Sequence, residues 1–375
     1  MVIFSGGTAF NETARVLKTL TQHSTHLLTP FDSGGSSAAL RVAFDMPAVG
    51  DLRSRLMALA DESLVGHQQV VKLFKTRVPK EIEPAAMALL LRGLTQGKDR
   101  LLTAIEPPIH DIVQSLLTRF FEAAPPDFDY RGASLGNLVL TGAYLAHHHR
   151  MDPTAALFSR LVKTAGTARL IVDSDLHLGA VLTNGEVVLG QHRMTGKETA
   201  ALKHPIKELF INRGLNVESR TEVGIKRRIR QMILESRLVV YAQGSFYTSL
   251  LANLLPSGVG EAIASHTTAP KVWIPNLGDD PEQLGMSLED AFDALIQTVR
   301  QDAPDARASD CVSHVLLDNQ TLYRGGIPKT RFAQLGIEVT EAKLTADQPE
   351  RFCPERLSAA LLELAVMSEQ SPLRG

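Results

Sequence analysis

Three short turns rich in glycine, serine and threonine are the stretches of this 375-residue chain best suited to chemistry. They read "SGGT" at 5–8, "DSGGSS" at 32–37 and "GS" at 244–245, and each lies between an apolar run and apolar residues at helical spacing. Glycine lets a ligand approach the backbone closely, and the free N–H groups at a helix N-terminus favour an anion. The turns therefore predict a site for a phosphate or diphosphate.

The predicted phosphate contacts come from all three turns, because backbone N–H groups and hydroxyls there would point at the same anion. We expect them from the following residues: Gly6, Gly7, Thr8, Asn11, Gly34, Gly35, Ser36, Ser37, Gly244 and Ser245.

Two familiar nucleotide-binding patterns fit less well. The first turn lacks GxxxxGK[ST], and no lysine is placed to reach a β- or γ-phosphate, which argues against a P-loop NTPase. Asp32 lies 25 residues after Gly7, close to where dinucleotide-binding folds place the acid that holds a ribose. The first turn has only a Gly-Gly pair instead of GxGxxG, so a nicotinamide-dependent oxidoreductase is the less favoured alternative.

The elements around the turns alternate as strand, helix and strand, which predicts a three-layer, Rossmann-like, doubly wound α/β fold with a mainly parallel sheet. We expect one domain over 1–375, with its core at about 1–50 and 166–345. Apolar residues at helical period predict a helical insertion at about 51–165 and a C-terminal helix at about 354–370. Asn184-Gly185 between two apolar runs predicts a β-hairpin.

The composition is that of a globular protein, with 44% hydrophobic and 21% charged residues. A formal net charge of −2 gives no electrostatic reason to expect nucleic acid or a membrane surface as a partner. Cys311 and Cys353 are too few for a disulfide framework, and the first strand leaves no room for a secretory signal, so we expect a cytoplasmic protein. The sequence leaves a homodimer open.

Two further stretches are more typical of surface structure than of a site. Three consecutive histidines at 147–149 would point about 100° apart on a helix, so they are not expected to share a metal ion. The basic run at 226–230 flanks Ile225 and Ile229, which predicts a buried stripe with a solvated basic face.

Five blocks together resemble one known family. They are "SGGTAF" at 5–10, "DSGGSS" at 32–37, "VGDLR" at 49–53, "GNL" at 136–138 and "GSFYTSLLANLL" at 244–255. In this order they resemble the CofD family of 2-phospho-L-lactate transferases and its YvcK-type relatives, which bind nucleotide sugars.

The resemblance implies transfer of a phospholactyl group from a guanosine diphosphate-linked donor to a hydroxyl of a deazaflavin precursor, with Mg²⁺ and release of GMP. Asp32 is then the expected catalytic residue, as the Mg²⁺ ligand or as the group that orients the attacking hydroxyl. The partners implied are a nucleoside diphosphate-linked small molecule of guanosine or uridine type and an acceptor small molecule. Substrate contacts are expected from Asp51, Arg53 and Asn137, which lie in the matched blocks. Asp173 and Asp175 are spaced to share one face of a strand, so they either line the acceptor pocket or are exposed acids of a loop.

Two departures from the family pattern keep a second function open. Ser33 stands where many relatives have a second aspartate, and Ala252 replaces a proline. The missing acid weakens the case for catalysis, while the phosphate-binding turns are common to both branches. A non-catalytic sensor of nucleotide sugars is therefore the alternative to a transferase.

Overall fold

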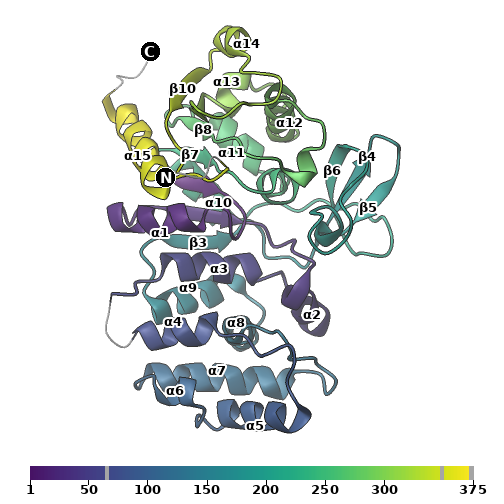
Figure 1. Ribbon diagram of the computed structural model, residues 1–375, viewed down its shortest axis with the longest axis vertical. Coiled ribbons are helices and arrows are strands. Elements are labelled where there is room, and N and C mark those ends of the chain that lie inside the picture. Colours follow the sequence, from purple (N-terminus) through teal and green to yellow (C-terminus); the bar gives the residue numbers. More distant parts are fainter. Residues whose placement is uncertain (64–66, 347–349, 371–375) are drawn as a thin grey trace.

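The computed structural model describes residues 1–63, 67–346 and 350–370, and its parallel sheet lies in the upper half of the molecule as drawn in Figure 1. Its strands are β1 (Val2–Phe4), β2 (Thr25–Leu28), β3 (Thr167–Leu170), β7 (Val239–Tyr241), β8 (Lys271–Trp273), β9 (His314–Asp318) and β10 (Glu338–Ala342). They lie in the order β10-β9-β8-β7-β1-β2-β3, and every neighbouring pair is parallel. The predicted doubly wound α/β sheet is confirmed.

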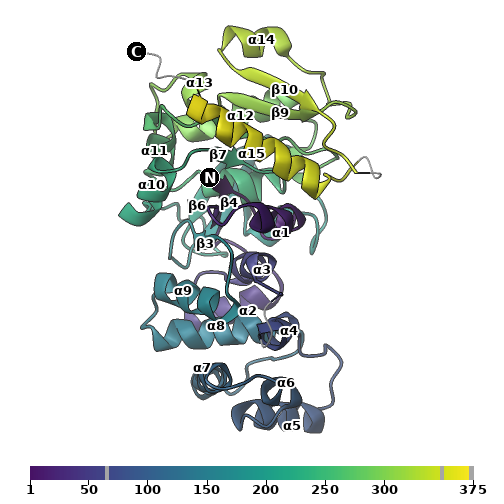
Figure 2. The same cartoon turned by 90° about the vertical axis from the view of Figure 1, so that its left-hand side faces the viewer.

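Successive residues of a strand face opposite sides of the sheet, and here they enter two apolar clusters. Ile3 packs into the cluster that includes α1 (Asn11–Leu20), α3 (Gly50–Leu59) and α15 (Pro354–Gln370). Phe4 packs into the other, with α10 (Arg227–Leu234), α11 (Val259–Ser265), α12 (Leu288–Arg300), α13 (Ala308–Cys311) and α14 (Lys329–Gln334). Figure 2 shows α15 lying beside α1 on one side of the sheet. The molecule therefore has the three layers expected.

The direction in which strands are added reverses between β1 and β7. The chain adds β2 and β3 on one side of β1, and later adds β8, β9 and β10 on the other side of β7. In open parallel sheets a ligand binds beyond the carboxyl ends of the strands at such a reversal. The turns at 5–8 and 244–245 follow β1 and β7, so the fold brings them to this point.

A long helical crossover joins β2 to β3. Besides α3 it contains α2 (Gly35–Phe44), α4 (His67–Lys75), α5 (Pro84–Thr95), α6 (Arg100–Thr103), α7 (Ile109–Ala123), α8 (Leu135–Ala146) and α9 (Met151–Val162). Figure 1 shows α5, α6 and α7 furthest from the sheet. The three histidines at 147–149 follow the end of α8, and the second and third have left-handed backbone angles.

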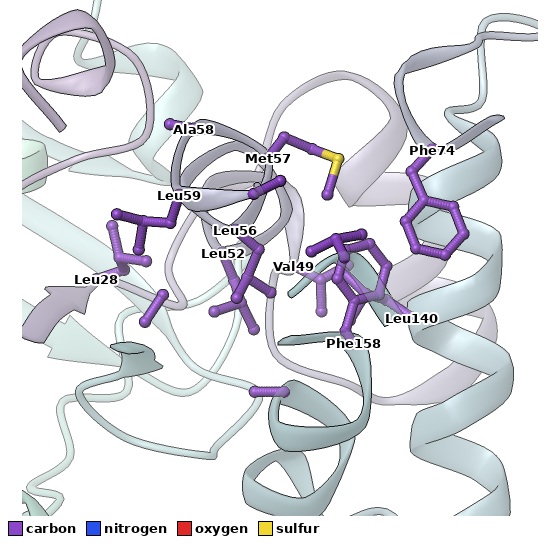
Figure 3. Packing of buried hydrophobic residues seen from close by; sticks show 14 of the residues in the cluster. Leu28, Val49, Leu52, Leu56, Met57, Ala58, Leu59, Phe74, Leu140 and Phe158 are labelled. Atoms are coloured by element: carbon purple, nitrogen blue, oxygen red, sulfur yellow. The ribbon is translucent and has the colours of Figure 1, made fainter. Parts of the chain in front are cut away.

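Helix α3 connects this crossover to the sheet. Its Leu59 lies near Leu28 of β2, while Val49, just before the helix, lies close to Leu140 of α8 and Phe158 of α9 (Figure 3). Because α3 packs against the sheet on one side and against α8 and α9 on the other, the polar residues at its N-terminus have fixed positions. The predicted insertion boundary at 51 falls inside α3, which packs against β2 and β3 as well as against α8 and α9.

A separate antiparallel sheet carries the predicted hairpin. Its strands are β4 (His177–Leu182), β5 (Val187–Leu189) and β6 (Ile206–Asn212), in the order β5-β4-β6. The turn between β4 and β5 contains Asn184-Gly185, with Gly185 at φ +88°. Sequence patterning did not identify β6, in which two exposed residues, Lys207 and Glu208, interrupt the apolar alternation.

Helix α10 differs in one detail from the expectation. It begins at Arg227, so its buried stripe consists of Ile229 and Ile233, and Ile225 precedes it. Lys226, Arg227 and Arg228 are exposed, as a solvated basic face requires. Within the described part of the chain, none of the helices combines the length and apolar character needed to cross a bilayer.

Candidate functional site

A cavity of about 290 Å³ lies where β1, β2 and β7 end. The predicted residues that line it are Gly6, Gly7, Thr8, Asp32, Asp51, Gly244 and Ser245. A larger cavity, of about 670 Å³, lies at the opposite ends of the strands and contains none of the predicted residues. We take the smaller cavity as the candidate site because ligands of parallel sheets bind at the carboxyl ends.

The glycines of the first turn are required by the closeness of their neighbours. A Cβ at Gly7 would lie 2.0 Å from Oδ1 of Asp51, and one at Gly6 would lie 2.4 Å from Oγ of Ser249. No larger side chain fits at either position unless α3 or the late turn moves. The first turn is thus pressed against both neighbouring elements.

A buried arginine of α3 hydrogen-bonds to the same turn. Arg55 of α3 donates hydrogen bonds to the Gly6 carbonyl at 2.8 Å, to Ser5 Oγ at 3.2 Å and to the Phe10 carbonyl at 3.3 Å. Burial lowers the pKa of Arg55 to about 9, which leaves the side chain charged at neutral pH. Sequence reasoning did not identify Arg55, which is four residues after Asp51 and therefore on the same side of the helix.

Two carboxylates share the cavity. Asp51 is in the first turn of α3, and burial together with the nearby Asp32 raises the pKa of Asp51 to about 6. The Gly7 amide hydrogen-bonds Asp51, and the Gly34 amide donates to Oδ1 of Asp32 at 3.1 Å. Each acid keeps further oxygen lone pairs for a ligand.

The late turn is clamped by an asparagine. The Gly244 amide donates to Oδ1 of Asn276 at 2.9 Å, and Nδ2 of Asn276 donates to the Gly244 carbonyl at 2.9 Å. Gly244 has φ +142°, a conformation that favours glycine. The prediction that this amide donates to phosphate does not match the geometry, because its hydrogen bond is already made within the protein.

Two carboxylates accept the backbone N–H groups at the start of the helical segment that follows the late turn. The chain forms a π-helical turn at Phe246–Leu250 and a 3₁₀ turn at Leu251–Asn253. The Phe246 amide donates to Asp280 at 2.7 Å, and the next two amides donate to Oε2 of Glu282 at 2.9 and 2.8 Å. Burial and the neighbouring Asp280 raise the pKa of Glu282 to about 7. Carboxylates of the protein thus occupy the place where an anion was expected.

Most of the remaining wall comes from the segment after β5, whose residues were not predicted to line the site. The lining residues that were not predicted are Ala9, Gln191, His192, Thr195, Lys197, Glu198 and Ser249. Lys197 is exposed and is the cation of this wall. The only available signal was a polar "GQHRMTGKE" stretch after a predicted strand, more than 40 residues from the nearest of the three turns.

The start of α2 lies beside the cavity instead of lining it. Glu198 covers Gly34, where a Cβ would lie 2.5 Å from Oε1 of Glu198. Gly35 has φ +52° and is exposed, Ser36 is half-buried, and Ser37 is buried next to Gly50. Asp32 is therefore the residue of "DSGGSS" that the structure brings into the cavity.

The other predicted residues have partners outside the cavity. Asn11 donates to Ser54 Oγ at 2.9 Å, and Arg53 donates to Asn137 at 2.9 Å where α3 meets α8. The remaining acids pair as Asp175 with buried Arg41, at 2.6 Å, and Asp173 with Lys226. These four contacts join secondary-structure elements and do not assemble a substrate pocket.

The described residues offer limited metal ligation. In 1–63, 67–346 and 350–370, no three His, Cys, Asp or Glu side chains are arranged to hold a metal ion. Asp32 and Asp51 remain as a pair whose like charges a cation would relieve. A protein pair of this kind suits Mg²⁺, which often takes one or two carboxylates and completes its shell with phosphates and water.

Comparisons with known proteins identify bacterial and yeast relatives of the chain. The chain is 26% identical to the gluconeogenesis factor of Bacillus subtilis over 298 residues. This match covers 79% of this chain and 74% of that protein. It is 27% identical over 211 residues to an uncharacterised protein of Saccharomyces cerevisiae, covering 52% of this chain and 45% of the yeast protein, so it spans less than half of that relative. A crystal structure of a Bacillus halodurans protein superposes with a TM-score of 0.70 at 22% identity, over 96% of this chain and 98% of the other.

The family model described as 2-phospho-L-lactate transferase CofD matches residues 1–345. That span includes both halves of the sheet, the helical crossover and every residue that lines the candidate cavity. The chain therefore belongs to the CofD family.

Proposed function

We propose that the cavity binds a nucleoside diphosphate-linked small molecule with Mg²⁺ and transfers its terminal phosphate-linked group to an acceptor hydroxyl. The observation that carries the proposal is the position of the cavity, at the strand reversal and between two glycine turns and two carboxylates. Family membership supports the same reaction class.

In this reaction the acceptor oxygen forms a bond to the transferred phosphorus, and the bond from phosphorus to the nucleoside monophosphate breaks. The acceptor hydroxyl loses its proton. Such transfers need positioning and neutralisation of spread negative charge more than covalent help from the protein. Gly6 and Gly7 provide close backbone approach, and Thr8 and Ser245 add hydroxyl groups to the lining.

Asp32 and Asp51 are the residues that would hold Mg²⁺. A bound Mg²⁺ ion would neutralise charge on the diphosphate. Without it, the two carboxylates would repel the same diphosphate. Burial, and after it the nearby Asp32, raises the pKa of Asp51. Asp32 is the favoured ligand because it is half-buried, lines the cavity and accepts only one described hydrogen bond at its carboxylate.

A second candidate is non-catalytic binding of a nucleotide sugar. Ser33, in place of the second family acid, bonds to His192 and supplies no carboxylate. Relatives named gluconeogenesis factor carry a name that states no transferase activity, which is compatible with this alternative. Binding of a uridine diphosphate sugar without turnover would favour it, and release of GMP from a guanosine diphosphate-linked donor would favour transfer.

Titration calorimetry with GDP, a uridine diphosphate sugar and NAD, each with Mg²⁺ and with EDTA, tests the proposal on wild type and Asp32→Asn. If Asp32 binds Mg²⁺, the substitution should weaken Mg²⁺-dependent binding at least tenfold, yet leave binding in EDTA unchanged or tighter, since repulsion of the phosphates is relieved. A clear loss of affinity in EDTA would contradict the metal role. It would instead favour a ribose contact, and with it the dinucleotide alternative.

A further inference from the structure

The wall formed by the segment after β5 contains a serine–histidine pair. Ser33 Oγ lies 2.8 Å from Nδ1 of His192, and the His192 backbone N–H donates to the same Oγ at 3.3 Å. Ser33 is 5% exposed and follows Asp32 directly, whereas His192 is half-buried and lines the cavity. Within the described residues, Ser33 Oγ has these two contacts and His192 Nε2 makes no hydrogen bond.

Hydrogen-bond counting decides which ring nitrogen of His192 carries the proton. A hydroxyl has one hydrogen to donate and two lone pairs with which to accept. If Nδ1–H donated to Ser33, the hydroxyl hydrogen would need a third partner in a nearly buried position, and the described residues provide none. If Ser33 donates to Nδ1 and accepts from the backbone N–H, the Ser33 hydroxyl is satisfied both as donor and as acceptor. The neutral ring then has its proton on Nε2.

The cavity has a use for such a donor. The Gly244 amide is held by Asn276, and the amides of 246–248 are held by acids, so the late turn offers fewer donors than its sequence suggests. Asp32 and Asp51 are acceptors only when ionised. Donors to an anion must therefore come largely from the first turn and from the wall after β5.

We propose that Ser33 fixes His192 with Nε2–H facing the cavity, where it donates a hydrogen bond to an anionic oxygen of the bound ligand. This inference rests on the proposed function, because the ligand it requires is a phosphate or diphosphate in this cavity. Ser33 is a positioning residue in this arrangement, and His192 is the binding residue. The serine found in place of the family acid then determines which ring nitrogen of His192 carries the proton. An ionised carboxylate can only accept, so aspartate at 33 would draw the proton to Nδ1 and leave Nε2 as an acceptor.

The first test is the position of the proton in the free protein. Long-range ¹H–¹⁵N correlation spectra of histidine-labelled protein at about pH 8, above the ordinary histidine pKa of about 6.5, distinguish the two neutral forms. Signals that disappear in His192→Gln identify His192. We expect Nε2 to be protonated in wild type and Nδ1 to be protonated in Ser33→Asp. Nδ1 protonation in wild type would overturn the inference.

The second test is binding of pyrophosphate and of GDP, each with Mg²⁺, by titration calorimetry. His192→Ala should bind pyrophosphate at least tenfold more weakly. His192→Gln, whose amide can also donate, should recover most of that loss. His204→Ala is the control, since His204 is an exposed residue of the same connecting segment that does not line the cavity, and it should bind like wild type.

The outcomes separate this inference from the proposed function. Equal pyrophosphate affinity in folded His192→Ala and wild type would refute the role of His192 even if nucleotides bind. Binding of pyrophosphate that depends on His192, without binding of any nucleotide, would support His192 and refute the proposed function. If wild type binds neither pyrophosphate nor a nucleotide, both fail.

Discussion

The buried Glu282 predicts that the stability of the α/β core decreases as pH rises. Its carboxylate accepts the amides of Tyr247 and Thr248 at 2.9 and 2.8 Å and the Thr248 hydroxyl at 2.6 Å, and Glu282 is 1% exposed. Burial is the largest cause of its raised pKa, and the nearby Asp280 is the second. The cost of ionising this side chain in the folded protein should therefore be measurable in unfolding.

The sign follows from proton binding. The pKa rises from an ordinary value of 4.5 to about 7, so between these values the folded state holds a proton that the unfolded state has lost. The free energy of unfolding then falls as pH rises, and the contribution present below about pH 4.5 is lost by about pH 7. At about 1.4 kcal/mol per pKa unit the full effect is about 3 kcal/mol, of which about 2.5 kcal/mol falls between pH 5 and 8.

Urea unfolding of wild type and Glu282→Gln at pH 5 and at pH 8 measures this effect. The chain has a single tryptophan, Trp273, which is buried in β8 against Phe292, so its fluorescence reports unfolding of the core. Glutamine keeps an acceptor for the two amides but does not ionise. Between pH 5 and pH 8 the free energy of unfolding of Glu282→Gln should therefore change by about 2.5 kcal/mol less than that of wild type. Glu289→Gln, at a half-exposed surface position, is the control. An identical pH dependence in wild type and Glu282→Gln would refute the reasoning.

Two further predictions concern close contacts. Gly7→Ala places a Cβ 2.0 Å from Oδ1 of Asp51 and 3.0 Å from its Cα, so we expect loss of about 1–3 kcal/mol in urea unfolding and at least tenfold weaker nucleotide binding. Gly214→Ala, with nothing within 4 Å, should match wild type in both measurements. Arg41→Met removes the hydrogen bonds of buried Arg41 to Asp175 and to the carbonyls of Asp32 and Leu176, and should cost about 1–3 kcal/mol in the same unfolding experiment. A loss no larger than that of a surface substitution would show that Arg41 does not join α2 to the chain before β4.

The architecture was predictable because its signals are local. Strands buried on both faces appear as short apolar runs, as in β1 and β7, whereas the edge strand β10 is mostly exposed and less apolar. Turn chemistry was equally local. Asn184-Gly185 forms the predicted hairpin, and Gly6 and Gly7 lie where only glycine fits. The order of elements then places the turns after β1 and β7 at one point, as parallel sheets require.

The partners within the site were not predictable, since they come from distant parts of the chain. Asp280 and Glu282 are in "DDPEQ", which has the composition of a solvated acidic turn, and nothing near it indicates that it accepts amides more than 30 residues away. His192 bonds to Ser33 across 159 positions. The family resemblance implied substrate contacts for Arg53 and Asn137, and the structure shows these two side chains hydrogen-bonded to each other between two helices.

The distribution of charge in the cavity predicts that a diphosphate binds there together with a cation. The described residues that line the cavity include three acids, Asp32, Asp51 and Glu198, and one lysine, Lys197. Arg55 lies behind the first turn and donates to its carbonyls, so its hydrogen bonds are already made within the protein. A diphosphate alone would meet more negative than positive charge, and burial of Asp51 makes that repulsion harder to screen. A divalent cation between the acids and the phosphates reverses the balance, so affinity for GDP should depend more on Mg²⁺ than on ionic strength.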